Sequence, residues 1–341
     1  MIKKNKRKKK RQGNSALPRI VCLGGGTGNF VVLSGLKKYP VKLSAVVAMT
    51  DDGGSSGILR DELGILPPGD IRQCLVALSG EDLILRKLFN YRFGNGTFKG
   101  HNFGNLFMVA LEKVIGSFDK SVEKASKVLN VHGEVIPVTL DKVWLMARLK
   151  NNRLLKGEHA ISKYRFLSKC KVKKLFTKPK ARANPKAISA IKKADLVVIG
   201  PGDLYCSILP IFLAEGIPEA IRKSRAKKVY DCNLMTERGH TNNFKVEDFV
   251  DVIESYLGKG IIDYVTFNTK KPSLHFLKKY SEKGAKLVEF SKITLKKKGY
   301  IGSNLINSKI YKKDTADIFL QRTPIRHHPD KIAKVLMNLL K

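Results

Sequence analysis

Short apolar runs alternate with amphipathic segments over most of the chain. Runs rich in β-branched residues predict buried strands at 19–23, 42–49, 195–200, 226–234 and 261–268. Apolar residues spaced three and four apart predict helices at 29–39, 70–79, 81–93, 102–115, 119–129, 185–193, 204–213, 247–257 and from Pro329 onward. Strands that alternate with helices in this way predict an α/β fold with a mostly parallel sheet.

The domain organisation follows from the same pattern and from the length of 341 residues. No clear linker divides the chain, so we expect a single domain over 19–341, preceded by a basic, disordered tail at 1–18. Segments 134–138 and 143–150 predict further strands, and "NNRLL" could turn the second into a hairpin. The basic stretch that follows matches no element, so 151–184 is the candidate insertion or subdomain edge.

The net charge of +36 favours anionic partners but does not identify one. Residues 1–11 hold eight Lys and Arg and no acid, and residues 160–182 hold nine and no acid. Two interpretations compete: contact with nucleic acid or an anionic membrane, and lysines that only solvate the surface. The second is favoured, because aromatic residues are not interleaved with the basic runs. We expect no sequence-specific nucleic-acid binding, and at most electrostatic membrane contact through the tail.

Cysteine use and hydropathy indicate a cytoplasmic protein. Cys22, Cys74, Cys170, Cys206 and Cys232 form no C-x-x-C pair, which argues against a zinc site and a disulfide framework. No apolar run reaches the roughly 20 residues that span a bilayer. The basic first residues lead into no apolar segment of the kind found in a secretory signal.

The first candidate for chemistry is a glycine loop between the first strand and the first helix. Backbone amides at such a loop, with the helix dipole behind them, suit a phosphate. The loop matches neither G-x-G-x-x-G nor a Walker A motif, so it indicates an anionic nucleotide without specifying a dinucleotide. The alternative is a tight strand-to-helix turn. The candidate binding residues are Gly24, Gly25, Gly26, Thr27 and Gly28.

The second candidate, "DDGGSSG", directly follows the second predicted strand. Ligands of open parallel sheets bind outside the carboxyl ends of the strands, so this loop should face the same crevice as the first. Two acids and two hydroxyls suit a divalent cation, or a base beside phosphate-binding groups. The alternative is an acid pair that caps a helix. We expect a metal at Asp51 and Asp52, and nucleotide contacts from Asp51, Gly53, Gly54, Ser55 and Ser56.

Two helix starts complete this group. In "PPGDIRQ" we expect Asp70 at an N-cap with Arg72 in the first turn, although Asp is also an ordinary capping residue. In "GHNFGN", His101 with Asn102 and Asn105 opens another helix, which favours recognition of an anion or a base over a purely structural role.

The second half of the chain repeats the pattern of strand followed by glycine loop. "GPGDLYCS" places Gly200, Gly202, Tyr205 and Ser207 at a strand end. "CNLMTERGHT" follows the next strand and adds Asn233, with a structural turn as an equal alternative. "RHHPD" near the end is more typical of surface residues, and no ligand spacing supports zinc there.

These motifs, in this order, resemble one known family. The segments that carry the resemblance are "GGGTG", "DDGGSSGILRDELGILPPGDIRQCLVALS", "LFNYRF", "GHNFGNLFMVAL", "ASKVLNVHGEVIPVTLDKV", "DLVVIGPGDLYCSILP", "KKVYDCNLMTERGHT" and "RHHPDKIAKVL". Together they look like the bacterial gluconeogenesis factors, relatives of the archaeal 2-phospho-L-lactate transferase, over about residues 19–340. The resemblance implies a Rossmann-like α/β fold, with helices on both faces of the sheet and a nucleotide site at the strand ends.

The two branches of the resemblance imply different functions. The gluconeogenesis-factor branch implies binding of UDP-sugars, UDP-N-acetylglucosamine or UDP-glucose, with a role in gluconeogenic growth, cell shape and wall synthesis. The transferase branch implies a Mg²⁺-dependent transfer of a group activated by a nucleoside diphosphate. The form "DDGGSSG…PPGDIR" is typical of the first branch, so the phospholactate reaction is not carried over. Asn29 after the glycine loop and the excess of Lys depart from the family's pattern.

The leading hypothesis is a regulator that binds a sugar nucleotide across the two glycine loops, with His101 and Asn105 near the base or sugar. The alternative is a transferase in which Asp51 and Asp52 hold Mg²⁺. Asp70, with Asp52 as a second candidate, would then orient or deprotonate an acceptor. We also expect a homo-oligomer and a regulatory protein partner; the apolar C-terminal helix could pair with a second copy or could simply cover the sheet.

Overall fold

The computed structural model describes residues 16–80, 83–164, 172–307 and 325–340. Of the predicted tail at 1–18, only residues 16–18 are described. Cys170 lies outside the described residues. Among the described residues, none of the helices is both long and apolar enough to cross a membrane.

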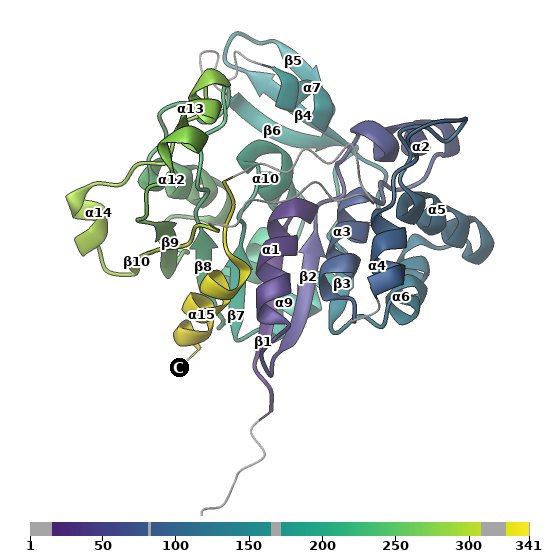
Figure 1. Ribbon diagram of the computed structural model, residues 1–341, viewed down its shortest axis with the longest axis horizontal. Coiled ribbons are helices and arrows are strands. Elements are labelled where there is room, and N and C mark those ends of the chain that lie inside the picture. The colour runs from purple at the N-terminus through teal and green to yellow at the C-terminus, as the bar shows by residue number, and fades with distance from the viewer. Residues whose placement is uncertain (1–15, 81–82, 165–171, 308–324, 341) are drawn as a thin grey trace, which may run out of the picture.

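A seven-stranded sheet forms the centre of the molecule (Figure 1). Every pairing in it is parallel, and its strand order is β10-β9-β8-β7-β1-β2-β3. The strands are β1 Arg19–Gly24, β2 Lys42–Val47, β3 Glu134–Pro137, β7 Leu196–Ile199, β8 Lys227–Asp231, β9 Tyr264–Asn268 and β10 Tyr300–Ser303. The α/β fold with a parallel sheet is confirmed.

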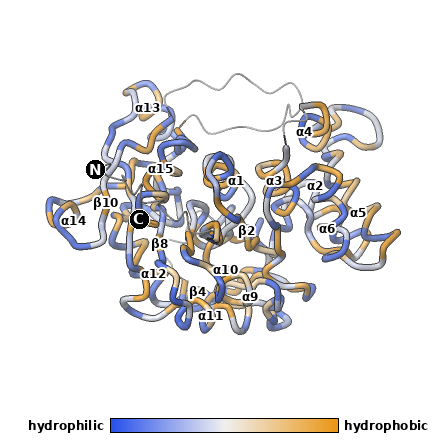
Figure 2. Tube along the Cα trace, turned by 90° about the horizontal axis from the view of Figure 1, so that it is seen from below, coloured by the Kyte–Doolittle hydropathy of each residue, from blue (hydrophilic) through white to orange (hydrophobic). Residues whose placement is uncertain are grey.

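Helices cover both faces of this sheet, as Figure 2 shows from below. One layer contains α1 (Gly26–Leu36), α3 (Gly69–Leu78) and α15 (Pro329–Leu339). The opposite layer contains α9 (Pro185–Lys193), α10 (Leu209–Phe212), α11 (Ile217–Lys223) and α12 (Val246–Leu257). The other helices are α2 Gly54–Leu63, α4 Leu83–Asn90, α5 Phe103–Ile115, α6 Phe118–Val128, α7 Glu158–Lys163, α13 Leu274–Glu282, α14 Lys292–Lys296 and the π-helix η1 Leu204–Ile208.

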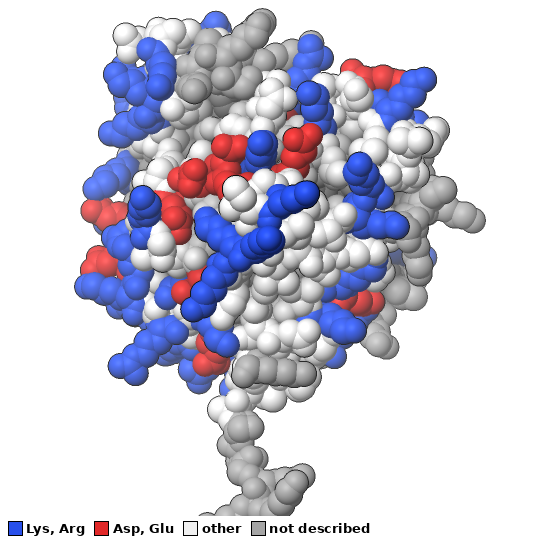
Figure 3. Space-filling model, turned by 90° about the vertical axis from the view of Figure 1, so that its left-hand side faces the viewer, with Lys and Arg blue, Asp and Glu red and all other residues white. Residues whose placement is uncertain are grey.

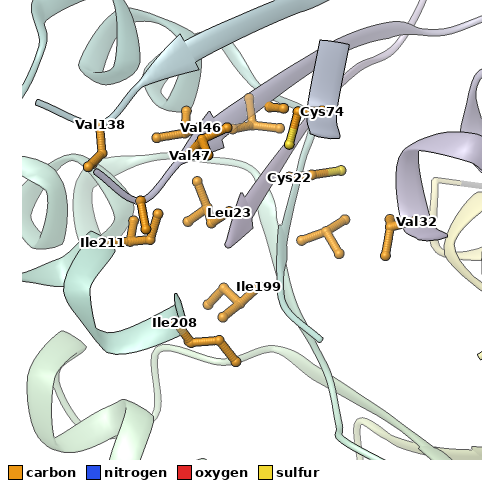
Figure 4. Close-up of a cluster of buried hydrophobic side chains, with 14 of the residues drawn as sticks. Cys22, Leu23, Val32, Val46, Val47, Cys74, Val138, Ile199, Ile208 and Ile211 are labelled. Atoms are coloured by element: carbon orange, nitrogen blue, oxygen red, sulfur yellow. The ribbon is translucent and has the colours of Figure 1, made fainter. Parts of the chain in front are cut away.

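The two helical layers explain why the central strands are apolar throughout. Successive side chains of β1 point to opposite faces, and both faces are covered. Cys22 lies with Cys74 of α3 on one side, whereas Leu23 lies with Ile199 and Ile211 on the other (Figure 4). All of these side chains are buried, and each large aliphatic one contributes about 2 kcal/mol of burial free energy.

A second, antiparallel sheet lies beyond the carboxyl ends of the main strands (Figure 1). It consists of β4 (Trp144–Leu149), β5 (Leu154–Lys156) and β6 (Val172–Lys178), in the order β5-β4-β6. This sheet overlaps the candidate insertion at 151–184, but its first strand begins earlier. The pattern did not predict β6 because three of its seven residues are lysines and only two of its side chains are buried.

Two expected helix starts differ in the structure. Pro68 occupies the N-cap position of α3, so the expectation that Asp70 would be the N-cap was wrong; Asp70 lies inside the first turn. The "DDGGSSG" segment is not only a loop, because α2 begins at Gly54 within it. Both starts contain glycines with small or rigid neighbours, which weakens the helical pattern at the boundary.

Basic side chains are numerous on the surface. On the face drawn in Figure 3, Lys and Arg are dispersed among acidic and uncharged residues. Several of them form ion pairs with exposed or partly exposed acids, such as Lys38 with Asp330 and Lys180 with Glu215.

Candidate functional site

A cavity of about 1060 Å³ opens where the strand order reverses. Neighbouring strands β1 and β7 are each followed by a helix on a different face of the sheet, and this arrangement separates their carboxyl-end loops. Eight of the predicted binding residues line the cavity: Gly26, Thr27, Gly28, Asp51, Asp70, Gly202, Ser207 and Asn233. The structure therefore brings together residues from the loops after β1, β2, β7 and β8.

The glycines after β1 allow neighbouring groups to approach the loop closely. They do not leave all of its backbone amides open to a phosphate. A Cβ on Gly28 would lie 1.7 Å from the Pro201 carbonyl oxygen, so only glycine allows the two loops to approach this closely. A Cβ on Gly26 would lie 2.7 Å from Asp70 Oδ1, and the Gly26 amide hydrogen-bonds the Asp70 carboxylate. An acid therefore already uses one of the amides that were predicted to hold phosphate.

Three acids meet on this wall of the cavity, from three parts of the chain. Asp51 follows β2, Asp70 lies in α3, and Glu158 begins α7 beside the small sheet. Burial raises the pKa of Asp70 to about 7, and the nearby Asp51 carboxylate adds to this rise. Burial also raises the pKa of Asp51. The same cause, together with Asp51 and Asp70, raises the pKa of Glu158 well above its usual range.

Asp52 has a different position from its neighbour Asp51. It does not line the cavity; its Oδ1 accepts a hydrogen bond from the His159 amide at 2.6 Å. A Cβ on Gly157 would lie 2.0 Å from Asp52 Oδ2, so that glycine lets the acid reach the start of α7. Asp52 therefore holds the start of α7 in place. As a result Glu158, the first residue of α7, lines the cavity where Asp52 was expected.

A second pair of acids, Asp203 and Glu237, also lines the cavity, and Asp203 is near enough to Glu158 to add to the rise in its pKa. Asp203 Oδ1 accepts hydrogen bonds from the amides of Tyr205 and Cys206, each at 2.9 Å, and so caps η1. Desolvation, and then the adjacent Asp203 carboxylate that shares a hydrogen bond with it, raises the pKa of Glu237 to about 9. Burial lowers the pKa of the neighbouring His240, so its imidazole is neutral near pH 7.

Basic side chains also line the cavity. Lys163, Arg238, Lys283 and Arg326 reach it from α7, the loop after β8, the end of α13 and the segment before α15. The cavity therefore offers cations for an anionic ligand as well as acids for a metal. None of these four residues was predicted, although Arg238 lies within "CNLMTERGHT" and Arg326 begins "RHHPD".

A separate polar network fixes the residues around Arg72. The Arg72 guanidinium donates to Asn105 Oδ1 at 3.0 Å, to the Phe89 carbonyl at 3.0 Å and to Asn90 Oδ1 at 2.9 Å. Ser55 Oγ lies 3.4 Å from His101 Nδ1 and accepts from the Asn105 amide group at 3.3 Å. These bonds tie α3, α4, α5 and α2 together at their ends.

Many predicted residues lie outside the cavity lining. They are Gly24, Gly25, Asp52, Gly53, Gly54, Ser55, Ser56, Arg72, His101, Asn102, Asn105, Gly200 and Tyr205. Gly200 has a φ of 74°, which makes the turn before Pro201. Tyr205 packs edge-on against His240, with 6.1 Å between ring centroids. A ligand contact for these residues stays a prediction.

Glu158, Asp203 and Glu237 were not among the predicted site residues. Two of them lie inside candidate motifs: Asp203 in "GPGDLYCS" and Glu237 in "CNLMTERGHT". An acid directly after a strand-end glycine turn was the available signal for Asp203. No comparable signal marked Glu158, which follows a short Lys-rich strand.

The acids of the first wall are the residues that would hold a divalent cation, although among the described residues their oxygens do not all lie within 4.8 Å of one another. Asp51 raises the pKa of Asp70 and of Glu158, and Asp70 raises that of Glu158; such a group is stabilised by either protons or a metal. Carboxylate oxygens are the ligands that Mg²⁺ prefers. A bound cation would supply positive charge between these acids and an anionic ligand in the cavity.

Comparison with known proteins places the chain in a family. The family profile described as 2-phospho-L-lactate transferase CofD matches residues 20–306, so the chain belongs to this family. Among its relatives, the gluconeogenesis factor of Bacillus subtilis (strain 168) is 40% identical over 328 residues, which are 95% of this chain and 98% of that protein. The gluconeogenesis factor of Halalkalibacterium halodurans is 38% identical over 322 residues, 93% and 95% of the two chains.

Solved structures agree with this assignment. A crystal structure at 2.60 Å of a UPF0052 family member from Bacillus halodurans matches with a TM-score of 0.85 and 37% identity. The match covers 94% of this chain and 99% of that chain. The resemblance to the gluconeogenesis factors and the α/β fold are both confirmed.

Proposed function

We propose that this protein binds a sugar nucleotide, UDP-N-acetylglucosamine or UDP-glucose, and acts as a cytoplasmic gluconeogenesis factor that regulates carbon flow to the cell wall and cell shape. The observation that carries the proposal is the cavity at the β1–β7 switch point, with cations and acids in one lining. At about 1060 Å³ it is as large as the upper range of ligand pockets, about 300–1,000 Å³. That size suits a ligand with base, ribose, diphosphate and sugar.

The charges of the lining suggest how the diphosphate is held. Arg238 and Lys283 offer cations from one side, and the amides at Gly28 and Gly202 lie at the two glycine loops. On the other side, Asp51 and Asp70 would repel a diphosphate unless a cation lies between them. Mg²⁺ on these acids would therefore be part of the ligand site, and binding should require it.

Calorimetric titration of UDP-N-acetylglucosamine and UDP-glucose, with and without Mg²⁺, tests the proposal. We expect saturable binding with Mg²⁺ and a loss of at least about tenfold in affinity without it. Asp70→Asn should abolish the Mg²⁺ dependence. Asp61→Asn is the matched control, because Asp61 is an exposed acid of α2 outside the cavity. The absence of heat at millimolar ligand, in a folded sample, would contradict the proposal.

One observation favours a second candidate, a Mg²⁺-dependent transferase. The pKa of Asp70 is raised to about 7, which suits a residue that accepts a proton from an acceptor hydroxyl near neutral pH. Release of nucleoside monophosphate from a nucleotide-activated donor, dependent on Mg²⁺ and lost in Asp70→Asn, would support it. The chain would then be an enzyme of the 2-phospho-L-lactate transferase type rather than a sensor alone. Ligand binding without any turnover, in the presence of candidate acceptors, would favour the sensor.

A further inference from the structure

Three potential metal ligands converge at the cavity, on the loops after β7 and β8. They are Asp203, in the loop after β7, and Glu237 and His240, in the loop after β8. One donor atom from each residue lies within 4.8 Å of the other two. Three donors spaced evenly around one ion, with bonds of about 2.0–2.2 Å, lie about 3.5–3.8 Å apart, so an inward shift of about 1 Å would bring these atoms into a coordinating arrangement.

His240 gives an independent indication of a missing ligand. The residue is 2% exposed, and neither ring nitrogen has a hydrogen-bond partner of good geometry within the described part of the chain, although the backbone of Ile161 and Ser162 lies close enough to act against the lowering of its pKa. Leaving a buried polar group unpaired is costly, so such groups normally have a partner. The imidazole is held in place by the edge-on contact with Tyr205. A neutral, buried imidazole beside two carboxylates has the chemistry of a metal ligand.

We infer that Asp203, Glu237 and His240 bind a divalent first-row transition-metal ion at a site separate from the Asp51–Asp70 wall. The donor set of two carboxylates and one imidazole selects the class of ion. Imidazole suits transition metals, whereas Mg²⁺ prefers oxygen ligands and retains its waters. The Mg²⁺ expected at Asp51 and Asp70 would therefore be a poor occupant of this site.

The surrounding hydrogen bonds orient the three ligands. The amides of Tyr205 and Cys206 fix Asp203 Oδ1 and leave the other oxygen for the ion. The Thr241 amide donates to the Glu237 carbonyl at 3.0 Å, and Thr241 Oγ1 accepts from the Glu237 amide at 2.8 Å. This closed turn holds Glu237 and His240 at a fixed spacing, as outer-shell contacts do at metal sites.

The site would also communicate with the cavity. Asp203 and Glu237 line it, so an ion held by three protein ligands would have coordination positions left for water or a ligand oxygen. The inference concerns the protein without nucleotide and does not depend on the proposed function.

Titration of the full-length protein with Co²⁺, without nucleotide, tests the inference. Visible absorption reports nitrogen and carboxylate coordination of Co²⁺, and calorimetry gives the affinity. We expect one equivalent of Co²⁺ whose d–d absorption band depends on His240, besides any Co²⁺ that binds at Asp51 and Asp70. His240→Ala should weaken binding about 100-fold or more and remove the band, because the only imidazole ligand is lost. Glu237→Gln keeps the side-chain shape and should weaken binding by at least about tenfold.

Two matched variants separate this site from other metal binding. His275→Ala removes an exposed imidazole of α13 and should change nothing. Asp70→Asn alters the other group of acids and should leave the absorption band that depends on His240 unchanged. The inference is overturned if wild-type protein binds no Co²⁺, or if both His240→Ala and Glu237→Gln bind it as wild type does. A band lost in Asp70→Asn and retained in His240→Ala would also overturn it.

Discussion

Asp70 and Arg72 lie two residues apart on α3, yet they belong to polar groups of opposite character. Arg72 is buried and donates to three acceptors on neighbouring helices. Asp70 faces a cavity with other acids, and its pKa is raised to about 7. Two positions along a helix are about 200° of rotation, so the two side chains emerge on opposite sides.

The polar residues around Arg72 stabilise the fold, whereas those around Asp70 are available to bind a ligand. The Arg72 group satisfies its hydrogen bonds within the protein, so removing a member leaves buried partners unpaired. The acids around Asp70 repel one another, so removing one of these charges should stabilise the ligand-free protein. Substitutions in the Arg72 group should therefore lower the stability of the fold. Substitutions in the Asp70 group should raise its stability and weaken ligand binding.

The largest effect is expected from Arg72→Ala. The substitution leaves the Phe89 carbonyl and the amide oxygens of Asn90 and Asn105 without their donor, which should lower the free energy of unfolding by about 3 kcal/mol. Urea denaturation measures it. Lys87→Ala, on the exposed part of α4, is the control and should change stability by less than about 0.5 kcal/mol. If Arg72→Ala and Lys87→Ala lowered the free energy of unfolding equally, the Arg72 group would have no special structural role.

Gly28→Ala should be the next most damaging change. The new methyl group would meet the Pro201 carbonyl, so the loops after β1 and β7 would have to separate, at a cost of about 2 kcal/mol. Gly53→Ala is the matched control, because its Cβ would meet only Asp51 Oδ1 at 3.4 Å. Thermal unfolding of both variants compares them. A Gly28→Ala protein as stable as wild type would show that this glycine serves a ligand and not the packing.

Asp70→Asn should raise stability in the absence of ligand. The folded-state pKa of about 7 exceeds the unfolded value of 3.8, so the native state binds more protons between these values. Wild-type stability should therefore fall as pH rises from 4 to 7, and the full penalty is present at pH 8. Asparagine cannot ionise, so at pH 8 the variant should gain about 1–2 kcal/mol in urea denaturation. A variant less stable than wild type at that pH would assign Asp70 to the structural group.

The smallest effect is expected at an ion-paired surface lysine. Lys186 contacts Asp119 and Glu123, and half of its side chain is exposed. Lys186→Ala should cost less than about 1 kcal/mol, and the difference should shrink further in 1 M NaCl. Chemical denaturation at low and high salt measures both. A salt-independent loss as large as that of Arg72→Ala would contradict the view that this pair is only a surface contact.

Prediction of the fold from the sequence succeeded where one element buries a continuous apolar face. The strands around 19–23 and 195–200 and the helix at 102–115 have this character, and each is present. Prediction failed for β6, where lysines face solvent, and for α2, which begins among glycines and serines. In those elements the tertiary contacts supply the stability that the local pattern lacks.

By itself the sequence determined the family, the parallel sheet and the loops that reach the site. Gly26, Asp51, Asp70, Gly202 and Ser207 follow strands or open helices, and strand ends converge in any such sheet. Only the tertiary structure decided which polar residues share a face. It directed Arg72 into the helices and Asp52 onto α7, and it brought Glu158, Asp203 and Glu237 to the cavity from distant segments. The reason is physical: whether a polar group is satisfied depends on partners far away in the chain, which the local pattern does not specify.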